Sequence, residues 1–155
     1  MLEIERKFLV KSDAFKQASI SKEYILQGFL NTHPERTVRV RVAGDFGYLT
    51  IKGKSNESGT TRFEWEREIA VADAMGLLKI CEEGVIEKTR FLVVFGGHNF
   101  EIDQFHGANE GLVIAEIELE REDETFERPD WLGYEVTGDV KYYNSHLSTK
   151  PYNKW

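Results

Sequence analysis

Alternation of apolar and polar residues is the dominant pattern along this chain, and it predicts eight short strands. The predicted strands span residues 2–10, 24–31, 36–43, 47–54, 61–70, 85–95, 99–106 and 112–121. Turn-forming residues separate them, for example at His33-Pro34, Gly44-Asp45 and Gly96-Gly97. Because short connections of this kind join antiparallel neighbours, most of the strands are expected to form antiparallel hairpins.

Three stretches depart from this alternation and predict short helices. Between residues 71 and 84, apolar residues recur at helical spacing, and this pattern stops near Gly84. In the stretch GDVKYYNSHLSTK, Asp139 is in position to cap a short helix. Residues 12–18 are expected to form one further helical turn. The fold class predicted is therefore mainly β (α+β), with a few helices packed outside the strands.

The polar faces of the predicted strands repeat charges of one sign. Residues two apart in a strand point the same way, so each such pair shares a face. The pairs are Glu3 and Glu5, Arg39 and Arg41, Lys52 and Lys54, Glu64 and Glu66, Lys88 and Arg90, Glu101 and Asp103, and Glu116 and Glu118. Lys7 follows the first pair on the same face. Like charges side by side are unfavourable unless opposite charges lie between them.

Two arrangements could account for these charged faces. In the first, each face is simply solvated, as on the outside of an antiparallel sheet. In the second, the sheet closes into a barrel with its charged faces inward, so that acidic strands face basic strands across a polar bore. The repeated sign favours the second arrangement. Such a bore fits a polyanion held by Arg and Lys, with a divalent cation bridging its oxygens to the carboxylates.

Length and composition narrow the class of protein further. The chain has 155 residues, 41% of them hydrophobic and 30% charged, which predicts one globular domain over residues 1–155. A formal net charge of −7 argues against nonspecific nucleic-acid binding. No apolar run approaches the roughly 20 residues that a bilayer requires. With a single cysteine, Cys81, and no apolar leader segment, a cytoplasmic location is expected.

In this order along the chain, the motifs resemble those of the CYTH superfamily, also called triphosphate tunnel metalloenzymes. The matching stretches are Glu3-x-Glu5-x-Lys7, Arg39-x-Arg41, Lys52 in TIK, Glu64-x-Glu66, Glu87-Lys88-x-Arg90, Asp103 in EID, Glu116-x-Glu118 and the terminal EVTGDVKYYN. The resemblance spans nearly the whole chain. It implies a closed eight-stranded antiparallel β-barrel that encloses a tunnel, with a helix near one mouth. It also implies hydrolysis or cyclisation of a triphosphate with Mg²⁺ or Mn²⁺.

The same resemblance implies a role for each matching residue. Glu3, Glu5 and Glu118 would hold the metal, with Glu116 close behind, and Glu5 would thereby be catalytic. The substrate-binding residues would be Lys7, Arg39, Arg41, Lys52, Arg90 and Lys141, the last of these at one mouth of the tunnel. Glu64, Glu66 and Asp103 would line the tunnel or hold a second metal; Glu64 and Glu66 could instead orient the basic side chains or form structural salt bridges.

Lys88 is the predicted general acid. A lysine among other cations in a confined site has its charged form disfavoured, so its pKa is expected to fall toward the range that suits proton transfer. In relatives the matching lysine is linked to protonation of the leaving phosphate. The other interpretation of Lys88 is a further phosphate ligand.

The leading functional hypothesis is hydrolysis of inorganic tripolyphosphate to pyrophosphate and phosphate. It is favoured because the chain is short and shows no additional aromatic segment that could stack a base or a thiamine ring. The alternatives are a class IV type adenylate cyclase, a nucleoside or thiamine triphosphatase, and a noncatalytic module that binds polyphosphate. The expected partner is a small-molecule triphosphate rather than nucleic acid or membrane, for a monomer or a homodimer.

Overall fold

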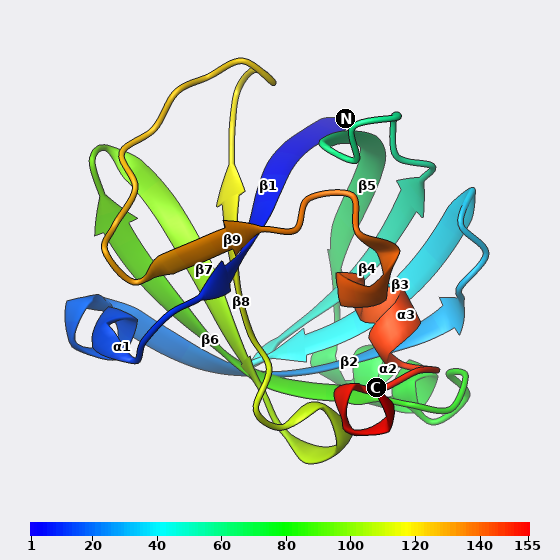
Figure 1. Ribbon diagram of the computed structural model, residues 1–155. Helices are drawn as coiled ribbons and strands as arrows, with labels where there is room; N and C mark the ends of the chain where they lie inside the picture. Colours follow the sequence, from blue (N-terminus) through cyan, green and yellow to red (C-terminus); the bar gives the residue numbers. More distant parts are fainter.

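The computed structural model describes residues 1–155 and shows the closed antiparallel β-barrel that the sequence predicts (Figure 1). The strands are β1 (Leu2–Val10), β2 (Ser21–Asn31), β3 (Arg36–Ala43), β4 (Phe46–Gly53), β5 (Thr61–Ile69), β6 (Ile86–Phe95), β7 (His98–Phe105), β8 (Val113–Glu118) and β9 (Leu132–Glu135). The α-helices are α1 (Ala14–Ala18), α2 (Val71–Leu78) and α3 (Asn144–Leu147). Three 3₁₀ turns complete the chain, η1 (Gly107–Asn109), η2 (Val140–Tyr142) and η3 (Tyr152–Lys154).

The strand β1 closes the barrel because it pairs with three other strands. The sheet runs β5-β4-β3-β2-β6-β7-β8-β1-β9, and a further pairing of β1 with β5 joins its two sides. The first part of β1, from Leu2 to Ile4, pairs with β5, whereas Glu5 to Leu9 pair with β8. The short strand β9 pairs with Phe8 and Val10, on the same edge of β1 that pairs with β5 nearer the N-terminus. Eight strands therefore enclose one space.

Cross-strand register directs the charged faces toward this space. Residues directly opposite each other on paired strands project to the same side of the sheet. The opposed pairs include Glu5 with Glu118, Lys7 with Glu116, Arg90 with Asp103, Lys52 with Glu64 and Arg62 with Glu3. Acidic and basic residues thus meet inside the barrel, as the repeated charges predict.

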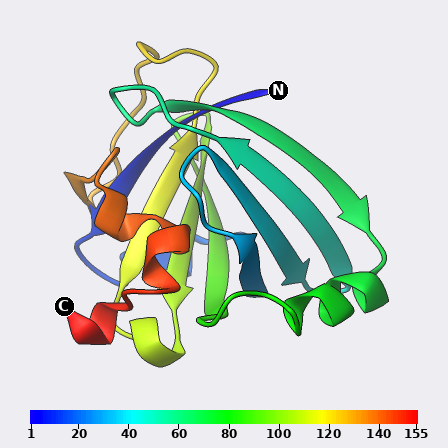
Figure 2. The same ribbon diagram turned by 90° about the vertical axis from the view of Figure 1, so that its right-hand side faces the viewer.

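The outer faces of the strands are apolar and are covered by other parts of the chain. One cluster of eleven buried residues includes Phe8, Phe100 and Ile117 on the strands, and Phe15 of α1 and Trp131 of the segment before β9 pack on it. On another side, α2 lies across β2, β3 and β4. Figure 2 shows α2 directly after β5 at the lower right, well apart from the C-terminal turns at the lower left.

A second apolar cluster lies inside one end of the barrel and anchors the C-terminal segment. Its strand residues, among them Ile86, Phe105 and Ile114, point inward where the charged positions end. Tyr142 of η2 and Leu147 of α3 pack against them. The C-terminal segment therefore covers part of one mouth of the barrel. None of the helices has the length and apolar character needed to span a membrane.

Several predicted boundaries are wrong. The second strand begins at Ser21, three residues earlier than predicted. The eighth strand spans only Val113–Glu118, because the backbone N–H of Glu120 donates to the Glu124 carboxylate at 2.7 Å instead of to a neighbouring strand. The helix predicted to extend to near Gly84 ends at Leu78. The chain beyond it turns toward β2, where the backbone N–H of Glu82 donates to the carbonyl of Phe29. In addition, β9 has no predicted counterpart.

The capping prediction for the C-terminal segment is correct in part. Asp139 does accept a hydrogen bond from the backbone N–H of Lys141, at 3.3 Å. The element that it caps is the 3₁₀ turn η2, and α3 begins only at Asn144.

Candidate active site

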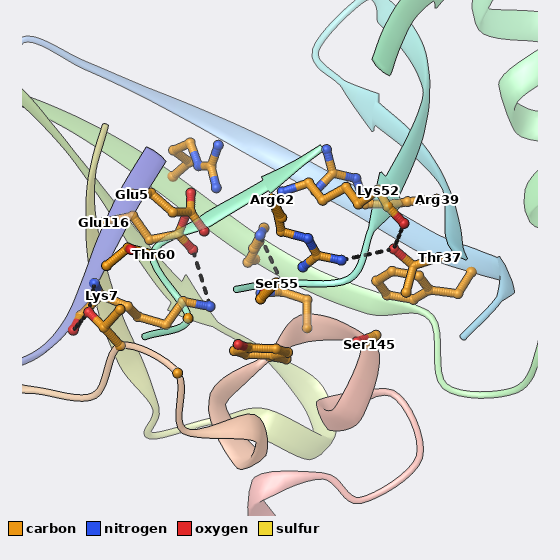
Figure 3. A pocket seen from close by; sticks show the side chains of 18 residues that line it. Glu5, Lys7, Thr37, Arg39, Lys52, Ser55, Thr60, Arg62, Glu116 and Ser145 are labelled. Carbon is orange, nitrogen blue, oxygen red and sulfur yellow. Dashed lines mark hydrogen bonds and ion pairs between the residues drawn. The ribbon is translucent and has the colours of Figure 1, made fainter. Parts of the chain in front are cut away.

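The barrel encloses a polar tunnel formed by two cavities that share five side chains, Glu5, Arg39, Lys52, Arg90 and Glu116. One cavity opens at a mouth that we call the carboxylate mouth, which is lined in addition by Glu3, Arg41, Glu64, Glu66, Glu101 and Glu118. The other, the inner cavity, extends toward the C-terminal segment and contains Lys7, Arg62, Lys88 and several hydroxyl groups (Figure 3). Twelve of the fourteen predicted site residues line these cavities; the exceptions are Asp103 and Lys141.

Lys88 is a buried cation with two close partners. Its Nζ lies 2.8 Å from Oδ2 of Asp103 and donates to Oδ1 of Asn144 at 3.0 Å. Burial disfavours the ammonium, and neighbouring Arg90 adds repulsion, so the pKa of Lys88 falls to about 8 despite the attraction of Asp103. A lysine with this pKa can donate a proton near neutral pH, as general acid catalysis requires.

Asp103 lies behind the tunnel wall and serves as the shared anion of two cations. Arg90 donates to both of its carboxylate oxygens, from Nε at 2.7 Å and from Nη2 at 2.8 Å, while Lys88 contacts Oδ2. Burial would raise the pKa of Asp103, but Arg90 and Lys88 outweigh burial and hold it well below the usual range. In this geometry Asp103 orients the two basic side chains.

The paired arginines Arg39 and Arg41 keep hydrogen-bonding capacity inside the tunnel. Each places Nη2 near Oε2 of Glu66, at 3.3 Å and 3.5 Å respectively. The Nε–H groups of both arginines are buried and have no acceptor. Burial, together with repulsion from Arg39 and Arg90, lowers the pKa of Arg41 to about 10. Two arginines share one carboxylate here, and each keeps a buried N–H group without an acceptor, which fits an anionic ligand.

Lys52 joins two of the acidic strands. Its Nζ lies 2.8 Å from Oε1 of Glu3 and 3.2 Å from Oε2 of Glu64. Burial alone would lower the pKa of Lys52, but the carboxylates of Glu5 and Glu3 raise it. Together with the Glu66 contacts, this makes Glu64 and Glu66 ion-pair partners of basic side chains in the tunnel.

The proposed metal ligands fit a hard cation in chemistry and register. Glu5 lies opposite Glu118, and Glu3 is two residues away on the same face of β1. Burial, together with repulsion from Glu116, raises the pKa of Glu5 to about 8. The pKa of Glu118 is also raised, by partial burial and by repulsion from Glu3. A divalent cation would relieve these penalties, because Mg²⁺ and Mn²⁺ prefer carboxylate oxygens.

The ligands are not gathered at coordination distance. No three His, Cys, Asp or Glu side chains converge closely enough to hold an ion. Glu3 instead contacts Lys52, and Glu116 lies 3.8 Å from the ammonium of Lys7. Lys7 and Arg90 also hold the pKa of Glu116 low, even though burial would raise it. To bind metal together with Glu5 and Glu118, the Glu3 carboxylate would have to leave Lys52.

The structure does not bring Lys141 into the tunnel. Its ammonium lies over the indole ring of Trp155, 4.6 Å from the ring centroid, and 5.2 Å from that of Tyr142. The neighbouring residues Tyr143 and Asn144 line the inner cavity in its place. Alternation does not hold in this irregular segment, so the sequence gives no indication of which side chains turn inward.

Three further residues belong to the site but are absent from the predicted set. Arg62 and Glu101 line the tunnel, and both share an inward strand face with predicted residues, so alternation could have identified them. Asn144 contacts Lys88 and also accepts a hydrogen bond from the buried Gln27 amide at 2.7 Å. Only the fold reveals Asn144, because it comes from the irregular C-terminal segment.

Comparison with known proteins gives the same assignment over the whole chain. The CYTH domain profile matches residues 1–146. An inorganic triphosphatase of Acetivibrio thermocellus is 49% identical over 155 residues, covering 99% of this chain and 97% of the relative. An inorganic triphosphatase of Nitrosomonas europaea is 36% identical, with 96% and 97% covered.

Solved structures agree with the architecture. The crystal structure of an inorganic triphosphatase superposes with a TM-score of 0.68 at 32% identity, covering 94% of this chain and 93% of that one. A protein from Pyrococcus horikoshii shares the fold with a TM-score of 0.63 at 21% identity, covering 78% and 81%. The profile and the curated relatives, each spanning most of the sequence, show that this chain belongs to the CYTH domain family.

Proposed function

We propose that this chain is a metal-dependent inorganic triphosphatase, which hydrolyses tripolyphosphate to pyrophosphate and phosphate. The observation that carries the proposal is the pair of buried Nε–H groups of Arg39 and Arg41, which lack an acceptor although both side chains line the tunnel. Phosphate oxygens would supply the missing acceptors. The relatives at 49% and 36% identity, both inorganic triphosphatases, support this choice of substrate.

The basic side chains would bind and align the phosphate chain. Lys7, Lys52 and Arg90 line the inner cavity together with Arg39. Figure 3 shows Lys7, Lys52 and Arg39 among the side chains around this cavity. Arginine can contact two phosphate oxygens at once, whereas lysine contributes a more mobile single charge. Holding the chain at several points positions the reacting phosphorus for in-line attack and stabilises the charge that develops on its oxygens.

The carboxylates Glu3, Glu5 and Glu118 would hold the metal, with Glu116 close to them. A bound Mg²⁺ or Mn²⁺ supplies a Lewis acid for the phosphate oxygens and lowers the pKa of a coordinated water. Lys52 then has a second role, because release of Glu3 to a metal frees its ammonium for the substrate. The exchange of partners would couple metal binding to phosphate binding.

Lys88 would protonate the departing phosphate group. Lys88 lines the inner cavity, and its ammonium is fixed by Asp103 behind the tunnel wall and by Asn144, which also lines the cavity. Because its pKa is about 8, the proton is available at neutral pH but is weakly enough held to be transferred. Asp103 would remain ionised throughout, since two cations stabilise its charge.

We also propose that the remaining properties follow the sequence-based expectations. Residues 147–155 would belong to the same domain as the matched region, a view supported by the packing of Trp155 against Tyr142 and Tyr152. The protein would act in the cytoplasm, without nucleic acid, as a monomer or homodimer.

A phosphate-release assay tests the activity. Tripolyphosphate, ATP, GTP and thiamine triphosphate are each incubated with Mg²⁺, Mn²⁺ or a chelator, and the products are separated by ion exchange. We expect metal-dependent cleavage of tripolyphosphate to equal amounts of pyrophosphate and phosphate, with much slower turnover of the organic substrates. Comparable turnover of ATP, or cyclic AMP among the products, would overturn the substrate assignment. Tight binding without hydrolysis would instead identify a binding module.

A further inference from the structure

Arg62 differs from every other basic residue of the tunnel in having no carboxylate partner. Seven basic side chains line its two cavities, namely Lys7, Arg39, Arg41, Lys52, Arg62, Lys88 and Arg90. Six of them have a carboxylate oxygen within 4.0 Å, and Arg62 has none. The positive charge of Arg62 is therefore the least compensated by nearby side chains.

The guanidinium of Arg62 is held in place but retains free donors. Nε donates to the backbone carbonyl of Gly53 at 3.1 Å, and Nη2 donates to Oγ1 of Thr37 at 3.3 Å. An arginine side chain has five N–H donors, so three remain. Figure 3 shows Arg62 projecting into the inner cavity, near Ser55 and on the same side as Lys52. These contacts fix the orientation of the side chain without using its capacity to bind an anion.

Arg62 also stands where the inner cavity opens to the outside. Both the inner cavity and an adjoining outer cavity, which we call the vestibule, include Arg62, Thr37, Ser55, Tyr143 and Ser145 in their walls. The vestibule lies between the loops that flank β3 and β5 and the C-terminal segment. Besides Arg62, its titratable lining consists of Lys54, His146, Tyr143 and one carboxylate, Glu57.

The two ends of the tunnel thus differ in charge. The carboxylate mouth is lined by seven acidic and four basic side chains, whereas the vestibule has a single acidic residue. Hydroxyl groups and an uncompensated guanidinium are the groups that bind phosphate oxygens. An anion whose other end lies near the carboxylate mouth would meet these groups at the vestibule.

We propose that Arg62 is a substrate-binding residue that contacts the phosphate group of the triphosphate nearest the vestibule. The proposal rests on the proposed triphosphatase function and extends it to a residue outside the family motifs. Arg62 would bind this phosphate through the N–H groups that Gly53 and Thr37 leave free. The contact fixes the distal end of the chain and contributes to binding rather than to the chemical step.

The test compares Arg62→Gln with Arg67→Gln. Arg67 lies on the same strand but on the outer face, where its guanidinium is 4.9 Å from the centroid of the Trp65 ring. Tripolyphosphate affinity is measured by titration calorimetry in chelator, and KM and kcat are measured with saturating Mg²⁺ or Mn²⁺. We expect Arg62→Gln to raise Kd and KM about tenfold or more, since a charge-assisted hydrogen bond is lost, with kcat changed little. Arg67→Gln should leave all three near the parent values.

The conservative variant Arg62→Lys separates a directed contact from a general effect of charge. It keeps the charge but cannot present two parallel N–H groups, so it should recover only part of the affinity. Parental Kd and KM in Arg62→Gln would overturn the role of Arg62, as would equal losses in Arg67→Gln. If the parent protein neither binds nor hydrolyses tripolyphosphate, the proposed function fails instead, so the two failures are distinct.

Discussion

Lys88 illustrates how the tunnel can hold a proton donor beside a carboxylate. An isolated buried lysine would lose much of its charge, and a simple buried ion pair with Asp103 would hold the proton too tightly. Arg90 changes this balance, because it donates hydrogen bonds to both carboxylate oxygens of Asp103 and its positive charge repels the ammonium of Lys88. The pKa of Lys88 therefore settles at about 8, between those two limits.

This arrangement predicts a specific pH dependence. The ammonium form of Lys88 is present below its pKa and is lost as the pH rises through about 8, so kcat/KM should fall above that pH. In Lys88→Arg the charge persists at every accessible pH, so this alkaline decline should disappear while the rate falls about a hundredfold or more. The measurement is kcat/KM for tripolyphosphate across the pH range at saturating metal. A Lys88→Arg enzyme that keeps the decline would exclude Lys88 as the acid.

A substitution at Glu5 tests whether this carboxylate binds the metal. Glu5→Gln removes the charge that a hard cation prefers, so the Mg²⁺ or Mn²⁺ concentration for half-maximal activity should rise at least about tenfold. As a control, Glu83→Gln removes an exposed carboxylate from the connection between α2 and β6 and should change nothing. A Glu5→Gln enzyme with parental metal dependence would remove Glu5 from the metal site.

The raised pKa of Glu5 also predicts how the metal-free protein responds to pH. Its folded-state pKa of about 8 exceeds the ordinary value of 4.5, so the stability contributed by the protonated form is complete below about pH 4.5 and lost as the pH rises through 8. Without metal, Glu5→Gln should therefore match the parent near pH 4.5 and exceed its thermal midpoint near pH 8. Saturating metal should abolish or reverse that difference.

At the residue scale, alternation predicted inward-facing positions but not the partner of each side chain. Strand periodicity placed Glu3 and Lys52 on charged strand faces, and the repeated sign of the charges favoured a common polar interior for both. Their contact at 2.8 Å depends on the closure of the barrel between β1 and β5, which no local pattern encodes. For the same reason the sequence could not indicate that Arg62 lacks a carboxylate. Lys141 was misplaced because its irregular segment has no period to interpret.

Among the elements, α2 is positioned by close approach to the barrel. A Cβ atom at Gly47 of β4 would lie 2.8 Å from Cβ of Ala74 on α2 and 3.1 Å from the backbone oxygen of Ile69. Neither atom belongs to a flexible side chain that could move away. The absence of a side chain at this one position therefore lets the helix lie directly on the sheet, outside the tunnel.

We expect Gly47→Ala to lower the free energy of unfolding by about 1–3 kcal/mol, because the added methyl group overpacks this contact. Activity per folded molecule should not change, since the tunnel lies on the opposite face. The matched control is Gly76→Ala, an exposed position of α2 with no atom within 4 Å of the added Cβ, which should be neutral or stabilising by up to about 1 kcal/mol. Urea denaturation of both variants checks the pair, and equal stabilities would show that α2 is loosely held.

The elements also show where prediction from the sequence stops. Eight strands were recognisable because each alternates over six or more residues. The four residues of β9 follow a long irregular segment and form a strand only because β1 offers them a free edge. The apolar cluster inside the barrel could not be predicted from the sequence either. At Ile86 and Ile114 the inward face becomes apolar, and alternation alone does not distinguish this change from the end of a strand.

On the scale of the whole molecule, the metal should be needed for activity but not for folding. The two apolar clusters hold the barrel without it, and in its absence Lys52 neutralises part of the charge of Glu3 and Glu64. We expect near-ultraviolet circular dichroism to be unchanged in chelator, while activity is lost. Mg²⁺ at a hundred times its Kd should add about 2.7 kcal/mol to the free energy of unfolding. Cooperative unfolding on chelation would show that the metal has a structural role.

The three pairings of β1 have a further consequence for how the chain acquires its structure. Glu5 and Glu118 are direct partners although more than a hundred residues separate them. Such nonlocal contacts give a high contact order, and folding is slow when distant segments must meet before they stabilise one another. During synthesis the edges of β1 can form hydrogen bonds only after β5, β8 and β9 have been made, so the apolar side chains of Ile4 and Phe8, which the finished fold covers, stay exposed until then. Crowding of nascent chains in that interval would favour aggregation over closure.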